Sequence, residues 1–250
     1  MYNFISRDNL EIIKNRYFFA NKFVKNNKIL EIGCGFGIGF RYFARSCKSY
    51  YGIDLNKEHI SLAKKNNYRN KNRFRVLNFS QLNLLNQKFD TIICLATIYY
   101  LDFPHFLKIC KKYLNKNGKL IFDTSNKNIL GFDGSWDNQT KYYQVPQLNH
   151  YLSKEGFKVK VFGAFPIEKA NLITNNKYKI RVFIKKLVKS LNLQFLKICL
   201  TFIFDRKFIK MKNCIDDQMK KYQYKYQYIS PVKKNDKFRV ILVSAMLKNV

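Results

Sequence analysis

The sequence predicts an α/β protein whose central sheet is doubly wound and mostly parallel. The first half of the chain alternates short apolar runs with segments in which apolar residues recur at helical spacing. Strands that alternate with helices in this way form a parallel sheet with helices on both faces. The chain has 250 residues, of which 47% are hydrophobic, so it is long enough to build one substantial core.

The expected elements follow one another along the chain. Apolar runs predict strands at 28–32, 50–54, 73–78, 90–95 and 119–123, with two more at 157–162 and 238–246. Helical spacing predicts helices at 38–47, 57–66, 103–114 and 144–156. The Asn117-Gly118 pair before the fifth strand is a turn signal, and Gly156 stands where it ends the last helix.

A glycine-rich turn joins the first expected strand to the first expected helix. Gly33, Gly35 and Gly37 alternate with other residues, and Glu31 lies two residues ahead of Gly33. Glycine lets the backbone adopt positive φ and lets a ligand approach closely. The helix that follows offers free N–H groups at its N-terminus. The turn therefore predicts a nucleotide-like ligand at the carboxyl edge of the sheet.

The spacing of this turn differs from a dinucleotide fingerprint. That fingerprint is G-x-G-x-x-G/A, and its last position, counted from Gly33, is Ile38. Asp54 ends the second expected strand, 21 residues after Gly33. An acidic side chain at such a strand end accepts hydrogen bonds from both ribose hydroxyls of an adenosine.

The run acidic-x-G-x-G-x-G resembles motif I of the class I methyltransferases, whose ligand is S-adenosylmethionine. Phe89-Asp90-Thr91 resembles the fourth strand of that family, and Glu155-Gly156-Phe157 resembles its turn before strand six. Arg16-Tyr17 resembles the N-terminal helix of methyltransferases from glycan and small-molecule pathways. The resemblance covers about residues 7–163 and the last strand.

The family resemblance implies a seven-stranded, mostly parallel sheet with an antiparallel last strand, and a helical insert between strands six and seven. We expect a methyltransferase core with an N-terminal helix at 1–163, an insert at 164–237 and the last core strand at 238–250. The stretch 179–212 of the insert is basic and amphipathic. Its apolar stripe must be buried, and we expect it to cover the substrate site. Docking at a membrane surface is the second choice, and a subunit contact the third.

The resemblance also implies which residues contact the methyl donor. They lie in the glycine turn and at the ends of the second, third and fourth strands. These residues are Glu31, Gly33, Cys34, Gly35, Gly37, Asp54, Leu55, Asn78, Phe79 and Leu95. Asn78 stands where the family often has Asp, and its carbonyl oxygen can accept the same hydrogen bond.

Three aromatic residues are candidates for the substrate pocket. Tyr99 and Tyr100 follow the fourth strand, near the expected methyl donor, and Trp136 lies in the loop after the fifth strand. The family often has Glu-His where this chain has the two tyrosines. That histidine is sometimes catalytic, so no general base is assigned to this chain.

Charge and cysteine usage bear on partners and compartment. The formal net charge of +31 predicts attraction to nucleic acid or to acidic membranes. A genome of low G+C content explains the same bias, because Lys, Asn, Ile, Tyr and Phe have codons rich in A and T. The six cysteines form no C-x-x-C pair, which predicts reduced thiols and no metal site. From the lack of a long apolar run we expect no signal peptide and no transmembrane segment. We expect a cytoplasmic protein, with peripheral membrane contact through 179–212 as an alternative.

The sequence favours a methyltransferase that acts on a small molecule or a glycan. An RNA-modifying methyltransferase is the first alternative, supported by the positive charge. A membrane-surface enzyme with a lipid-linked acceptor is the second, and a binding protein that keeps the fold without turnover is disfavoured by the intact glycine turn and Asp54. Enzymes that methylate base amino groups usually carry [DN]-P-P-[FYW] after strand four, where this chain has Leu95-Ala96-Thr97-Ile98.

Overall fold

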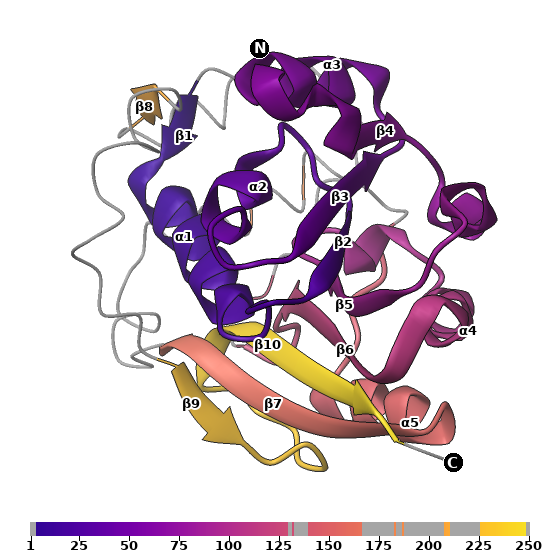
Figure 1. Ribbon diagram of the computed structural model, residues 1–250. Coiled ribbons are helices and arrows are strands. Elements are labelled where there is room, and N and C mark those ends of the chain that lie inside the picture. Colours follow the sequence, from indigo (N-terminus) through magenta and orange to yellow (C-terminus); the bar gives the residue numbers. More distant parts are fainter. Residues whose placement is uncertain are drawn as a thin grey trace.

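The computed structural model of the protein describes residues 4–129, 132, 140–166, 183, 187, 208–210 and 226–248 (Figure 1). Within these residues an eight-stranded sheet runs through the molecule, flanked by helices on both faces. The fold is therefore the α/β arrangement that the sequence predicts.

The order of the sheet is β4-β3-β2-β5-β6-β10-β7-β9. Its strands are β2 (Lys28–Ile32), β3 (Ser49–Asp54), β4 (Phe74–Val76), β5 (Phe89–Cys94), β6 (Leu114–Ser125), β7 (Phe157–Pro166), β9 (Tyr226–Ile229) and β10 (Phe238–Leu247). The five strands from β4 to β6 pair in parallel. β10 lies between β6 and β7 and is antiparallel to both, as predicted for the last strand.

Helices cover each face of the sheet. The helices are α1 (Arg7–Asn21), α2 (Ile38–Phe43), α3 (Lys57–Asn66), α4 (Phe103–Tyr113) and α5 (Val145–Lys154), with short 3-10 segments η1 (Tyr68–Arg73), η2 (Phe79–Leu85) and η3 (Ile98–Tyr100). Neighbouring residues of β2 point to opposite faces: Ile29 joins the cluster that contains Phe19 of α1, and Leu30 joins the cluster that contains Phe106 of α4. Figure 1 shows α1 and α2 on one side of the sheet and α4 and α5 on the other.

The expected count of seven strands is wrong, because the sheet has an eighth strand at its edge. β9 lies inside the expected insert 164–237 and pairs antiparallel with β7, which itself extends to Pro166. The aromatic rings of Tyr226 and Tyr228 both pack edge-on against Phe162 of β7. The pairing of β9 with β7, supported by these ring contacts, adds an eighth strand at the edge of the sheet. The predicted boundary at 164 falls within β7.

The expected insert also reaches the N-terminal end of the chain. β1 (Phe4–Ser6) pairs antiparallel with β8 (Phe208–Lys210), although about 200 residues separate them in the sequence. This pairing brings part of the insert next to the start of α1. The rest of the predicted amphipathic stretch 179–212 lies outside the described residues, apart from the exposed Phe183 and Leu187.

Candidate functional site

Hydrogen bonds to the neighbouring strand β3 fix the glycine turn at the end of β2. The backbone N–H groups of Gly33 and Cys34 both donate to the carbonyl oxygen of Ile53, over 2.8 and 3.0 Å. Gly33 has a φ of 73°, and a Cβ atom there would overlap the side chain of Thr97. At Gly35, with a φ of 51°, a Cβ atom would meet nothing within 4 Å. The first glycine therefore serves close packing, whereas the second leaves space for a ligand.

Asp54 lies at the end of β3 directly beside this turn. Its Oδ2 accepts a hydrogen bond of 3.0 Å from the backbone N–H of Gly35, and its Oδ1 accepts one of 2.9 Å from that of Asn56. His59 Nδ1 lies 3.6 Å from Oδ1. An ionised carboxylate has about four acceptor sites, so Asp54 can accept further hydrogen bonds from a ligand.

A cavity of about 500 Å³ opens at the carboxyl ends of β2, β3 and β5. Its walls come from α1, the glycine turn, the β3 end, η2 and the segment after β5. The lining residues are Ile13, Arg16, Tyr17, Ile32, Gly33, Cys34, Gly35, Phe36, Ile38, Ile53, Asp54, Leu55, His59, Leu77, Phe79, Leu95, Ala96, Thr97, Tyr100 and Leu101. The volume and the mostly apolar lining suit an adenosine-containing ligand.

Seven of the ten predicted donor residues line this cavity. They are Gly33, Cys34, Gly35, Asp54, Leu55, Phe79 and Leu95. Leu55 is 64% exposed and therefore forms part of the rim rather than of the floor. The other three predicted residues, Glu31, Gly37 and Asn78, do not line this cavity. Gly37 precedes α2, and Asn78 accepts a hydrogen bond from the backbone N–H of Ser80 at the start of η2.

Glu31 is buried in a cluster of tyrosines rather than directed into the cavity. Its carboxylate accepts hydrogen bonds from the hydroxyl groups of Tyr17 on α1 and Tyr50 on β3. A side chain at Gly39 of α2 would overlap this carboxylate. Burial raises the pKa of Glu31 to about 7, although the two tyrosine hydrogen bonds oppose the shift. Glu31 thus joins α1, α2 and β3 beneath the cavity.

A second acidic residue, Asp123, was missed by the sequence reasoning. It is fully buried at the end of β6, and its Oδ2 lies 2.6 Å from Nε of Arg16. Its Oδ1 accepts a 2.8 Å hydrogen bond from the backbone N–H of Ala96. Ala96 lines the cavity with a φ of 54°, an unfavourable conformation for a residue with a Cβ atom. Burial raises the pKa of Asp123, and Arg16 opposes that shift.

Arg16 also borders a second cavity, of about 450 Å³, beside the N-terminal half of α1. Its walls come from α1, η3, the loop after β6 and the start of β10. The lining residues are Asn9, Ile12, Ile13, Arg16, Tyr99, Ser125, Ile129, Phe132, Tyr142, Arg239 and Val240. Ile13 and Arg16 line both cavities, so these two residues form a wall that the cavities share.

The candidates for the substrate pocket do not line the same cavity. Tyr100 lines the first cavity and Tyr99 the second. The ring of Tyr99 stacks on Tyr142 with centroids 5.3 Å apart, and Tyr142 packs edge-on against Phe132 at 4.9 Å. Trp136 lies outside the described residues. Spacing alone gave no signal for these contributors, because Phe132 and Tyr142 come from the connection between β6 and α5, whereas Arg239 comes from β10.

The fold and the turn together define a Rossmann-like methyltransferase domain. Residues 30–122 match a family described as a methyltransferase domain. A solved S-adenosylmethionine-dependent methyltransferase from Archaeoglobus fulgidus is similar in fold, with a TM-score of 0.59 and 15% identity over 94% of this chain and 93% of that one. Residues 30–122 of the chain therefore form a methyltransferase domain, on a fold that S-adenosylmethionine-dependent methyltransferases share.

Relatives with an assigned activity match part of the chain. A ubiquinone biosynthesis O-methyltransferase from Pelagibacter ubique is 33% identical over 116 residues, which are 45% of this chain and 48% of the relative. A tRNA U34 carboxymethyltransferase from Nautilia profundicola is 28% identical over 156 residues, 56% of this chain and 51% of the relative. The chain thus spans about half the length of these relatives, which differ in substrate.

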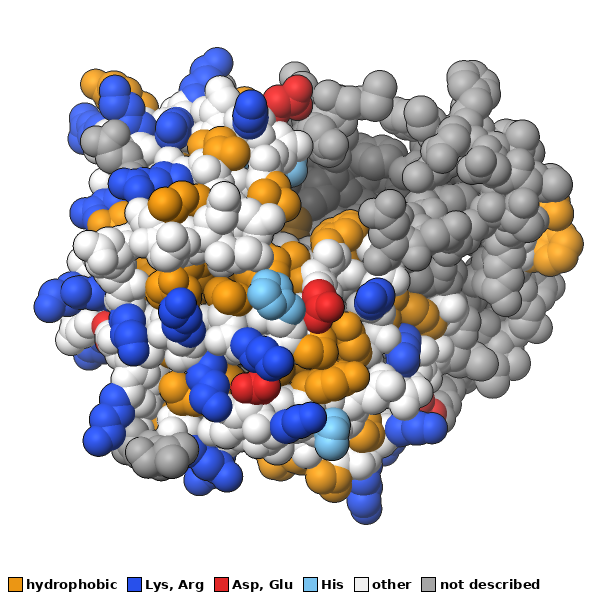
Figure 2. Space-filling view, turned by 90° about the vertical axis from the view of Figure 1, so that its right-hand side faces the viewer, with side chains coloured by type: hydrophobic (Ala, Val, Ile, Leu, Met, Phe, Trp, Pro, Cys, Tyr) orange, Lys and Arg blue, Asp and Glu red, His pale blue; other side chains and the backbone are white. Residues whose placement is uncertain are grey.

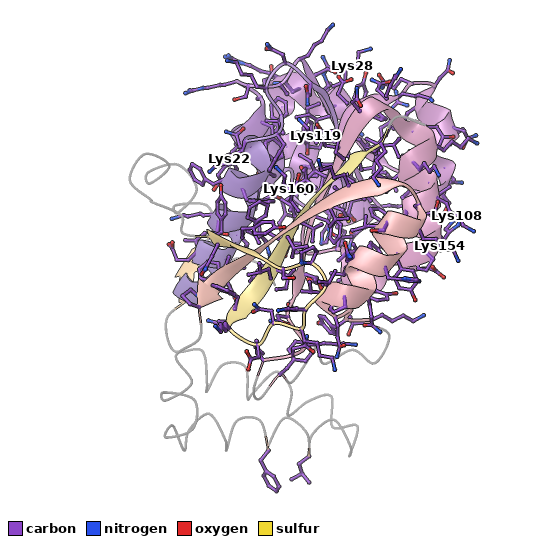
Figure 3. The ribbon with its side chains drawn as sticks, turned by 90° about the horizontal axis from the view of Figure 1, so that it is seen from below. Lys22, Lys28, Lys108, Lys119, Lys154 and Lys160 are labelled. Carbon is purple, nitrogen blue, oxygen red and sulfur yellow. The ribbon has the colours of Figure 1, made fainter. Side chains whose placement is uncertain are left out.

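Positive charge is dispersed over the described surface. Figure 2 shows Lys and Arg side chains scattered between hydrophobic ones on one side of the molecule. Viewed from below, Lys22, Lys119 and Lys160 lie toward α1, and Lys108 and Lys154 lie on α4 and α5 on the opposite side (Figure 3). In the part of the chain that the structure describes, no helix is long and apolar enough to cross a membrane, and no group of His, Cys, Asp and Glu could hold a metal ion.

Proposed function

We propose that this protein transfers a methyl group from S-adenosylmethionine to a small-molecule acceptor. The donor occupies the cavity at the glycine turn, and the acceptor occupies the second cavity. The observation that carries this proposal is that Ile13 and Arg16 line both cavities, so the two spaces are neighbours. A methyl transfer needs the donor and the acceptor aligned in one line, and their binding spaces must therefore lie next to each other.

The donor contacts follow from the chemistry of the lining. The carboxylate of Asp54 already accepts hydrogen bonds from the backbone N–H groups of Gly35 and Asn56. Its remaining acceptor sites accept hydrogen bonds from the ribose hydroxyls. Leu55, Leu77 and Phe79 enclose the adenine ring. The guanidinium of Arg16 uses Nε toward Asp123, and its remaining N–H groups suit the donor's carboxylate. Bound S-adenosylmethionine supplies an activated methyl group on its sulfonium sulfur.

The insert 164–237 would cover the acceptor cavity. The backbone pairing of β8 with β1 holds part of this segment beside α1, whose residues Asn9, Ile12, Ile13 and Arg16 line that cavity. A cover at this position excludes water from the acceptor. We propose the same division of the chain as the sequence predicts, except that β7 continues to Pro166 and β9 belongs to the sheet.

An RNA acceptor is the second candidate function. The tRNA-modifying relative and the net charge of +31 favour it. Among the described residues, lysines lie on both sides of the sheet, which favours a small molecule, because an RNA-binding surface gathers its basic residues on one face.

Calorimetry and a labelled donor test the proposal together. The protein should bind S-adenosylhomocysteine, the product of the donor. With methyl-labelled S-adenosylmethionine and fractionated cell extract, label should enter the small-metabolite fraction. Label in RNA would support the second candidate, and label in the lipid fraction would support a membrane-surface enzyme. A protein that binds no S-adenosylhomocysteine would refute the methyltransferase proposal altogether.

A further inference from the structure

The second cavity carries a positive charge beside an aromatic wall. The exposed Arg239 lines it from the start of β10, together with Tyr99, Tyr142 and Phe132, whose rings pack against one another. Arg16 lines the same cavity, but its charge is compensated by Asp123. Within the described part of the chain, the cavity is lined by no acidic residue and Arg239 makes no ion pair.

The backbone at Arg239 is fixed by a buried side chain. Asn126, which follows β6, donates from its Nδ2 to the carbonyl oxygens of Asn235 and Phe238, each over 2.8 Å. The backbone N–H of Asn126 donates to the carbonyl oxygen of Arg239 itself, over 3.1 Å. Asn126 is only 1% exposed, so these bonds are shielded from water. The side chain of Arg239 is therefore attached to a backbone that is fixed by hydrogen bonds.

We propose that this cavity selects an acceptor with a flat ring and an anionic group, either a carboxylate or a phosphate. The proposal rests on the proposed function and names the substrate class for the same site. The planar guanidinium of Arg239 forms paired, charge-assisted hydrogen bonds with the anionic oxygens. The ring of the acceptor lies against Tyr142 and Tyr99, in the offset or edge-on contacts that aromatic pairs prefer. The reactive atom of the acceptor then faces Arg16, where the two cavities meet.

Matched pairs of probes separate the charge from the ring. The ligands are phenylacetate, 4-hydroxybenzoate and indole-3-acetate, each compared with its neutral amide, and phenyl phosphate is compared with phenol. Binding is measured by calorimetry on protein saturated with S-adenosylhomocysteine. At least one anionic probe should bind ten-fold or more tightly than its neutral partner. The carboxylate and phosphate arms show which of the two anions the site prefers.

Three variants locate the selectivity. Arg239→Gln should bring an acid and its amide within about two-fold of each other and leave the affinity for S-adenosylhomocysteine unchanged. Arg69→Gln removes the same charge from the exposed segment η1 and should keep the full preference. Tyr142→Leu should weaken the acid and the amide by the same factor, because it removes the ring contact and not the charge.

The outcomes keep this inference separate from the proposed function. Failure to bind S-adenosylhomocysteine counts against the methyltransferase proposal. If S-adenosylhomocysteine binds normally, the anionic-acceptor proposal is overturned by any of three results: equal affinities for acid and amide, a preference that survives Arg239→Gln, or no binding of any probe in the panel.

Discussion

The guanidinium of Arg16 lies 2.6 Å from the carboxylate of Asp123, which is completely buried at the end of β6. This ion pair joins α1 to the centre of the sheet. Because the backbone N–H of Ala96 bonds to the other oxygen of Asp123, the same carboxylate also holds the strained turn after β5. Asp123 therefore fixes the position of α1, which lines both cavities, relative to the turn after β5.

Breaking this pair on one side should be costly. Arg16→Met leaves the buried carboxylate of Asp123 without a counter-charge, and we expect it to lower the free energy of unfolding by about 3–5 kcal/mol. The double variant Arg16→Met/Asp123→Leu should recover much of that loss, because it removes both charges. Urea denaturation of the two variants measures the difference. Equal destabilisation of both would show that the pair is not the source of the effect.

The glycines of the turn should respond differently to substitution. Gly35→Val places a side chain in open space at the cavity, so it should abolish binding of S-adenosylhomocysteine while costing only about 1–2 kcal/mol of stability from its positive φ. Gly33→Ala should cause a larger loss of stability, because its Cβ atom overlaps Thr97. Thermal melts and calorimetry of both proteins check this. A Gly35→Val protein with undiminished donor affinity would contradict the proposed position of the ligand.

Asp54 should contribute directly to donor affinity. We expect Asp54→Ala to weaken binding of S-adenosylhomocysteine by about 1–3 kcal/mol, since the ribose hydroxyls lose a charged acceptor. Asp90→Ala is the matched control. Asp90 also accepts two hydrogen bonds, from the backbone N–H of Lys28 and from Asn115, but at the amino end of the strands. Similar losses of affinity in both variants would point to a general structural effect.

Glu31 should make the protein less stable as the pH rises toward neutrality. Burial raises the pKa of Glu31 from its ordinary value of 4.5 to about 7, so the folded state holds the proton more tightly than the unfolded state. The stabilisation is complete below pH 4.5 and is lost as the pH rises through 7, by about 3 kcal/mol in all. Glu31→Gln should remove this part of the pH dependence, whereas Glu58→Gln in the exposed first turn of α3 should not. Melting temperatures between pH 4.5 and 8 provide the measurement.

The sequence was sufficient to predict the local elements and the donor side of the site. β2 and α3 begin and end at the predicted residues. The spacing of apolar residues and the turn residues that bound an element are local features of the sequence, so they can be recognised without the fold. The glycine turn and Asp54 were found for the same reason: a turn and the end of the next strand are fixed by local spacing. The antiparallel last strand followed from the family resemblance and is confirmed by the pairing of β10 with β6 and β7.

Only the tertiary structure decided which distant residues meet. Nothing in the spacing of Arg16 and Asp123 indicates an ion pair, and the second cavity collects Tyr142 and Arg239 from segments far apart in the chain. The eighth strand depends on the packing of Tyr226 and Tyr228 against Phe162. Glu31 belongs to the glycine-turn motif but does not line the cavity, because the hydroxyl groups of Tyr17 on α1 and Tyr50 on β3 donate hydrogen bonds to its carboxylate. Local patterns specify strands and turns, whereas burial and pairing across the chain depend on the complete packing of the sheet and its helices.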